Sequence, residues 1–143
     1  RGQRFGAVSQ PEYLAAVSRD PILAIQIEHA DAVANIDEIL AVDGIDIICL
    51  GPNDLSGSMD KLGLIDDPEV IAAITTVAEK VRASERILGV STFYSPETFA
   101  RWMELGVGWI NLNVDWANLY RASQEVVEMA RTSATEPAAQ QNH

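Results

Sequence analysis

The sequence has little cysteine, few basic residues and no long apolar run. Its one cysteine, Cys49, has no partner for an internal disulfide, so we expect a cytoplasmic protein that stays reduced. Ten lysines and arginines stand against 21 acidic residues, and the formal net charge of −11 repels phosphate backbones and anionic lipids. No apolar run approaches the ~18 residues that a membrane span requires. These shortages argue against nucleic acid and membranes as partners.

The length limits the number of domains. With 143 residues, 48% of them apolar, the chain can build one domain with a core and is too short for two. It also lacks an initiator methionine, because it opens at Arg1. The sequence therefore predicts a piece of a longer protein.

Short apolar runs alternate with segments of helical period. The runs are rich in β-branched residues and lie at 22–27, 45–50, 87–92 and 109–114. Helices are expected near 10–18 and over 30–41, 68–83, 96–105 and 116–131. This alternation predicts an α/β fold of parallel strands joined by right-handed helical crossovers.

Two further segments and several helix ends carry local signals. Residues 51–66 read as an unusually long loop, and long loops in compact α/β units are often functional. Residues 132–143 lack bulky apolar side chains and are predicted to form a disordered tail. Capping residues mark the predicted helix ends, with Ser9, Asp67, Ser95 and Asp115 at the starts and Gly106 at an end.

Polar residues follow the first two predicted strands, at the edge where parallel α/β sheets bind ligands. Alternation puts Gln26 and Glu28 on one face of the first strand, and a buried Glu needs a partner or a cation. Asp54 follows the turn at Gly51-Pro52, after the second strand. Two carboxylates at neighbouring strand ends suit a hard cation such as Mg²⁺. Alternatively, Glu28 lies exposed or caps a helix, and Asp54 forms an Asx turn or a helix cap.

For the remaining polar candidates, a structural role is favoured over a role in ligand binding or catalysis. Asn111 and Asn113 share a face of the fourth strand and could bind a ligand, but mutual hydrogen bonds or a cap on the last helix are favoured. His29 is interpreted as a helix-start or surface residue rather than a general base. Trp102 has Phe99 and Leu105 at helical spacing, which indicates a packing stripe.

Three segments together resemble a known family. Gln26-Ile27-Glu28, the segment from Asn35 to Val42 and Gly51-Pro52-Asn53-Asp54-Leu55-Ser56 resemble the HpcH/HpaI aldolases, which are metal-dependent class II pyruvate aldolases grouped with the citrate lyase β-subunits. The likeness continues through Glu104-Leu105-Gly106 and covers residues 1–131. It implies the C-terminal half of a TIM (β/α)₈ barrel, strands five to eight. The first six residues resemble the segment before strand five.

The resemblance also implies an activity and the residues that serve it. The family's reaction is the retro-aldol cleavage of 4-hydroxy-2-oxo acids to pyruvate and an aldehyde. By resemblance, Glu28 and Asp54 are the ligands of a divalent ion of the Mg²⁺, Mn²⁺ or Co²⁺ type. Gln26 would lie beside the 2-oxo acid, and the backbone amides of Asn53 and Asp54 would receive its carboxylate.

Other parts of the family's machinery are not matched. The catalytic His base and a carboxylate-binding Arg come from the N-terminal half, so this half supplies no catalytic residue and is expected to be inactive alone. Family members form homo-oligomers, in which the last helix often packs on a neighbouring subunit.

Two other functions remain open. A CoA-ester lyase of the citrate or malyl type would share the fold and metal, although Gln26 and Gly51-Pro52 fit the aldolases better. A non-catalytic half-barrel that acts as an interaction module would have to cover two exposed sheet edges.

Overall fold

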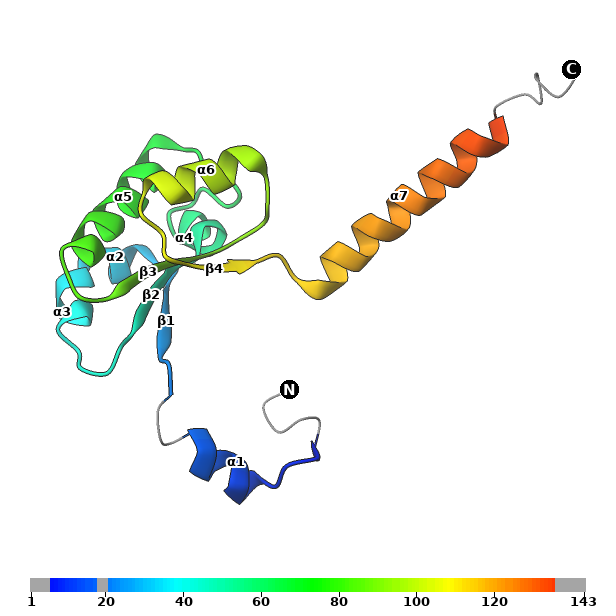
Figure 1. Ribbon diagram of the computed structural model, residues 1–143. Coiled ribbons are helices and arrows are strands. Elements are labelled where there is room, and N and C mark those ends of the chain that lie inside the picture. Colours follow the sequence, from blue (N-terminus) through cyan, green and yellow to red (C-terminus); the bar gives the residue numbers. More distant parts are fainter. Residues whose placement is uncertain (1–5, 18–20, 136–143) are drawn as a thin grey trace, which may run out of the picture.

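The computed structural model describes residues 6–17 and 21–135 (Figure 1). Four strands form one parallel sheet in the order β1-β2-β3-β4. They are β1 (Ala24–Ile27), β2 (Ile47–Leu50), β3 (Ile87–Thr92) and β4 (Trp109–Leu112). Each lies within its predicted run, so the parallel α/β architecture is confirmed.

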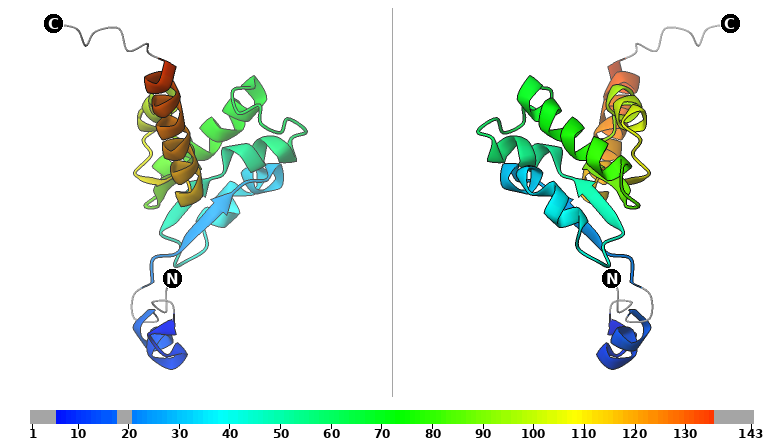
Figure 2. Two further views of the ribbon diagram at one scale, coloured as in Figure 1. Left: turned by 90° about the vertical axis from the view of Figure 1, so that its right-hand side faces the viewer. Right: turned by 90° about the vertical axis from the view of Figure 1, so that its left-hand side faces the viewer.

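Helices precede, connect and follow the strands. They are α1 (Gln10–Val17), α2 (Ala30–Ala34), α3 (Ile36–Leu40), α4 (Pro52–Ser58), α5 (Pro68–Arg82), α6 (Pro96–Glu104) and α7 (Asp115–Thr135). Helices α2 to α6 gather on one side of the sheet, whereas α7 projects away from it (Figures 1 and 2). Within residues 6–17 and 21–135, no helix has the length and apolarity needed to cross a bilayer.

The core lies between the sheet and these helices. Side chains alternate along a strand, so every second residue faces the helices. The strand residues in the core are Ile27, Ile48, Leu50, Leu88 and Val90. They pack with residues of α3, α4, α5 and α6, among them the wholly buried Trp102. Trp102 and Leu105 have the predicted packing role, whereas Phe99 is 38% exposed and does not belong to the core.

The other face of the sheet belongs to the alternate residues. Gln26, Cys49 and Gly89 are register neighbours on three successive strands. A Cβ on Gly89 would lie 3.0 Å from the side chains of both Ile47 and Trp109. A side chain at position 89 would therefore require Ile47 or Trp109 to move.

The predicted long loop at 51–66 is wrong in its first half, because Pro52–Ser58 forms helix α4. Gly51 is its N-cap and Pro52 occupies the first helical turn, where its missing N–H costs nothing. Buried Ser56 then holds the turn that follows, since its hydroxyl accepts a hydrogen bond from the Gly63 N–H at 3.1 Å. The Gly- and Ser-rich composition concealed this helix.

Two other helices differ from their predicted bounds. The segment 30–41 is broken at Asn35 into α2 and α3. In α7, the Val114 carbonyl accepts the first backbone hydrogen bonds, from Ala117 and Asn118, so Asp115 is the first helical residue rather than the cap. The helix runs on to Thr135, past the predicted tail boundary at 132, and residues 136–143 lie outside the described residues.

The other predicted caps are present. Ser9 accepts from the Glu12 N–H at 3.4 Å, and Ser95 accepts from the Thr98 N–H at 3.1 Å. Gly106 follows α6 with φ +81°, a conformation that glycine adopts without strain. Asp67 caps α5 and also pairs with Lys61, which lowers the pKa of Asp67 and raises that of Lys61. This pair ties the segment after α4 to the start of α5.

Candidate active site

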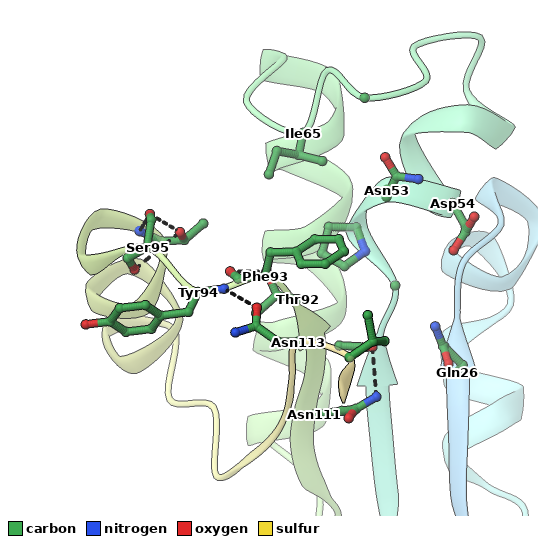
Figure 3. Close-up of a pocket in the computed structure, with 16 residues that line it drawn as sticks. Gln26, Asn53, Asp54, Ile65, Thr92, Phe93, Tyr94, Ser95, Asn111 and Asn113 are labelled. Carbon is green, nitrogen blue, oxygen red and sulfur yellow. Dashed lines mark hydrogen bonds between the residues drawn. The ribbon is translucent and has the colours of Figure 1, made fainter. Parts of the chain in front are cut away.

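A pocket of about 440 Å³ opens at the carboxyl edge of the sheet (Figure 3). All four strands run parallel, so the segments that follow them meet at this one edge. The pocket collects polar side chains from these segments, namely Gln26, Asn53, Asp54, Ser91, Thr92, Asn111 and Asn113. The three residues predicted to bind substrate, Gln26, Asn53 and Asp54, thus lie in one pocket.

Gly51 makes room at the end of β2 for side chains from the end of β1. A Cβ at position 51 would lie 2.7 Å from Nε2 of Gln26, 3.1 Å from Cβ of Glu28 and 3.4 Å from Oε2 of Glu28. Gln26 and Glu28 therefore both lean against Gly51, as strand alternation predicted for one shared face. Gln26 and Gly51 line the pocket, whereas Glu28 is exposed and is not among the described residues that line it.

The charge of Glu28 affects the pKa of the buried Cys49 thiol. Burial, and after it the negative charge of Glu28, raise the pKa of the Cys49 thiol to about 11. Glu28 itself is exposed at the end of β1, as the alternative interpretation of it allowed, and its Oε2 lies 3.4 Å from the position of a Cβ on Gly51. Because the thiol stays protonated at neutral pH, Cys49 has no character as a nucleophile or a metal ligand there.

Asp54 enters the pocket from helix α4. Asn53 and Asp54 lie in the first turn, where backbone N–H groups have no partner within the helix. Figure 3 shows the Asp54 carboxylate and the Gln26 amide extending into the same space. Gly51 is the N-cap, without a side-chain cap bond, so the alternative capping role for Asp54 is wrong.

The two predicted metal ligands have the donor chemistry that a hard divalent ion requires. Neither the Glu28 nor the Asp54 side chain makes a hydrogen bond or ion pair with any other residue that the structure describes. The described part of the chain holds no group of three or more His, Cys, Asp or Glu that could bind a metal. Two free carboxylates would leave most coordination positions to water and substrate oxygens, which suits ions of the Mg²⁺ type.

The asparagines of the fourth strand bond to the β3 segment instead of to one another. Asn111 Nδ2 donates to Ser91 Oγ at 3.2 Å, and Asn113 Oδ1 accepts from the Tyr94 N–H at 2.9 Å. Asn113 Nδ2 also donates to Asn118 of α7 at 3.2 Å. The favoured structural role is therefore correct, but the expected mutual hydrogen bond is not formed.

His29 takes the helix-start position predicted for it. Its Nδ1 accepts from the Asp31 N–H at 3.1 Å at the N-cap of α2, and the side chain is exposed. Among the described residues that line the pocket, none is His, Lys or Arg. The described lining thus offers amide, hydroxyl and carboxylate groups.

Sequence reasoning missed the apolar side of the pocket. Ile65, Phe93 and Val114 contribute to the lining, together with Tyr94. The signal was present for Phe93, an aromatic residue between the end of a strand and the cap residue Ser95. Ile65 gave no local signal, because only the fold of the α4–α5 segment brings it to the pocket.

Comparisons with known proteins agree on one family. The family model described as HpcH/HpaI aldolase/citrate lyase matches residues 8–122. A hydroxypyruvate/pyruvate aldolase of Pseudomonas aeruginosa is 33% identical over 97% of this chain and 51% of its own length. A 4-hydroxy-2-oxo-heptane-1,7-dioate aldolase of Shigella flexneri is 31% identical over 100% of this chain and 52% of its own.

The fold agrees as well. The crystal structure of an HpcH/HpaI aldolase from Desulfitobacterium hafniense DCB-2 matches with a TM-score of 0.73 at 26% identity, over 94% of this chain and 51% of that one. The chain therefore spans about half the length of these proteins.

Proposed function

Because the chain belongs to the HpcH/HpaI aldolase/citrate lyase family, we propose that it forms the metal-binding half of an aldehyde-lyase active site. The reaction is the divalent-metal-dependent cleavage of 4-hydroxy-2-oxo acids to pyruvate and an aldehyde. The observation that carries the proposal is that Glu28 Oε2 lies 3.4 Å from the position of a Cβ on Gly51, while Asp54 enters the pocket from the first turn of the helix that Gly51 caps.

Four polar residues at the ends of β1 and β2 have a part in this proposal. Glu28 and Asp54 hold the divalent ion, which supplies Lewis-acid stabilisation of charge when bound. Gln26 lies beside the 2-oxo acid, where its amide donates to an oxygen of the substrate. The N–H groups of Asn53 and Asp54, in the first turn of α4, receive the substrate carboxylate, since anions are favoured at a helix N-terminus.

The proton acceptor comes from another part of the protein. Cleavage breaks the bond between C3 and C4, while the C4 hydroxyl gives up its proton and C3 keeps the electron pair. Neither His, Lys nor Arg occurs among the described residues that line the pocket. We therefore propose that the described half binds and orients the substrate, and that it does not turn it over alone.

Helix α7 supports a homo-oligomer. Large apolar side chains project into solvent along its length, in a pattern of three- and four-residue spacings. These residues are Trp116, Leu119, Tyr120, Val126, Val127 and Met129. We propose that this α7 stripe packs against a second copy of the protein, because a projecting helix would otherwise leave a large apolar surface in water.

The test removes each carboxylate from the full-length gene product. Glu28→Gln and Asp54→Asn keep the side-chain size and remove the charge. We expect each to weaken Mn²⁺ binding, measured by calorimetry, and Mn²⁺-dependent pyruvate release at least about a hundredfold, because ligands matter more than the groups that support them.

The control is Asp60→Asn, which removes the same charge just after α4 and outside the pocket. Asp60 has φ +59°, a conformation that asparagine also tolerates. Wild-type Mn²⁺ affinity and activity in both the Glu28 and Asp54 variants would overturn the proposal.

A further inference from the structure

The pocket has two chemically different sides. Gln26, Asn53 and Asp54 form the side at the ends of β1 and β2, which carries the acidic charge, while neutral polar groups of Ser91, Thr92, Asn111 and Asn113 line the ends of β3 and β4. Ile65 and Phe93 lie across from the side with the acidic charge, and Figure 3 shows the Phe93 ring extending from the end of β3 toward Asn53. Phe93 is 65% exposed, so part of its side chain is open to a ligand in the pocket.

The backbone beside Phe93 is held on both sides. Thr92 Oγ1 donates to the Phe93 carbonyl at 3.3 Å, and the Tyr94 N–H donates to Asn113 at 2.9 Å. The Tyr94 ring packs on Phe99 of α6, with 6.2 Å between centroids. Phe93 is therefore presented from an anchored segment, which reduces the ordering cost of binding a ligand against it.

The charge of the described pocket lining is of one sign. Asp54 is the one charged residue among its described lining residues, and no lining Lys, Arg or His offsets it. A ligand carboxylate placed against Phe93 and Ile65 would lose water without gaining a counter-charge from any described lining residue, which is unfavourable. An apolar group in the same place gains from burial against the aromatic ring.

We propose that the Phe93 side of the pocket binds the aldehyde portion of the substrate and favours aldehydes with an apolar substituent over those with a carboxylate. The inference rests on the proposed aldolase function. The side at β1 and β2 holds the 2-oxo acid, so the aldehyde carbon that bonds to it approaches from the side on which Phe93 and Ile65 lie. A dioate substrate would put its second carboxylate against Phe93, where the described lining offers no cation.

The experiment compares two aldehydes of the same shape in the aldol direction. Full-length enzyme with Mn²⁺ and pyruvate is given 4-methylpentanal or 4-oxobutanoate, which differ by an isopropyl group in place of a carboxylate. We expect kcat/KM to favour 4-methylpentanal by at least about tenfold, a discrimination that apolar pockets commonly reach. Phe93→Ala lowers this ratio about tenfold, and Phe93→Arg inverts it by supplying a cation.

The control variant is Leu62→Ala, which shortens an exposed apolar side chain of the neighbouring segment outside the pocket lining, and it leaves the ratio unchanged. A preference for 4-oxobutanoate, or an unchanged ratio in Phe93→Ala, overturns the inference and leaves the aldolase function standing. Absence of aldol product with both aldehydes and with glycolaldehyde overturns the aldolase function and the inference with it.

Discussion

Replacing Gly51 by alanine perturbs the candidate active site through a single methyl group. The new Cβ would lie 2.7 Å from Gln26 Nε2 and 3.1 Å from Glu28 Cβ. Gly51 has φ −111°, which alanine adopts freely, so the backbone is not strained. The whole effect of Gly51→Ala must therefore come from the two side chains that lean on this position.

The two contacts respond differently. The Gln26 amide is the far end of a flexible side chain and can rotate away, so its displacement costs little stability. The Glu28 Cβ is attached to the backbone just after β1 and must move by a few tenths of an ångström. Overpacking of this limited kind costs about 1 kcal/mol of unfolding free energy. A shifted carboxylate and a displaced amide should weaken Mn²⁺ binding about tenfold or more, as changes around metal ligands usually do.

Gly57→Ala is the matched control in the same helix. Its Cβ would meet only Leu62, with Cδ1 at 3.1 Å, and this side chain is exposed and can give way. Alanine inside a helix is favoured over glycine by about 1 kcal/mol, which offsets that contact. We expect Gly57→Ala to keep both the stability and the Mn²⁺ affinity of the wild type.

The affinity for Mn²⁺ is measured by calorimetric titration of the full-length protein. The stability of each variant is measured separately by urea denaturation without metal. Denaturation separates a global loss of stability from a local loss of affinity. If Gly51→Ala binds Mn²⁺ as tightly as Gly57→Ala, the positions of Gln26 and Glu28 against Gly51 do not matter for the ion. That result would refute the reasoning that links this close contact to metal binding.

Two further predictions concern the thiol and the last helix. With a pKa of about 11, folded Cys49 has a thiolate fraction at pH 8 roughly a hundredfold below that of the unfolded chain, so iodoacetamide should alkylate it slowly without urea. The thiol of the unfolded chain ionises at a lower pH than that of the folded chain, so this group lowers the free energy of unfolding as the pH rises from about 9 toward 11. Equal alkylation rates with and without urea would be inconsistent with burial of Cys49. Leu119→Glu combined with Val126→Glu should reduce the mass measured by light scattering, whereas an unchanged oligomer would exclude the α7 stripe as the contact.

Local chemistry in the sequence was sufficient for most of the architecture. Runs of β-branched residues identified the four strands, and the pairs Asp67-Pro68 and Ser95-Pro96 identified two helix starts. Strand alternation placed Gln26 and Glu28 on the same face, because that period is a property of the extended backbone itself. Parallel strand order then brought their ends to one edge, together with Asp54.

Tertiary structure decided what depends on residues distant in sequence. Helix α4 forms in a Gly- and Ser-rich segment because Leu55 and Ser56 become buried against the rest of the fold. The bond between Asn113 and Tyr94 joins segments 19 residues apart, and no periodicity encodes it. Phe93 and Asp54 come from different strand ends, and only the sheet makes them two sides of one pocket. Local preferences act within a few residues, whereas a pocket is assembled by packing across the whole chain.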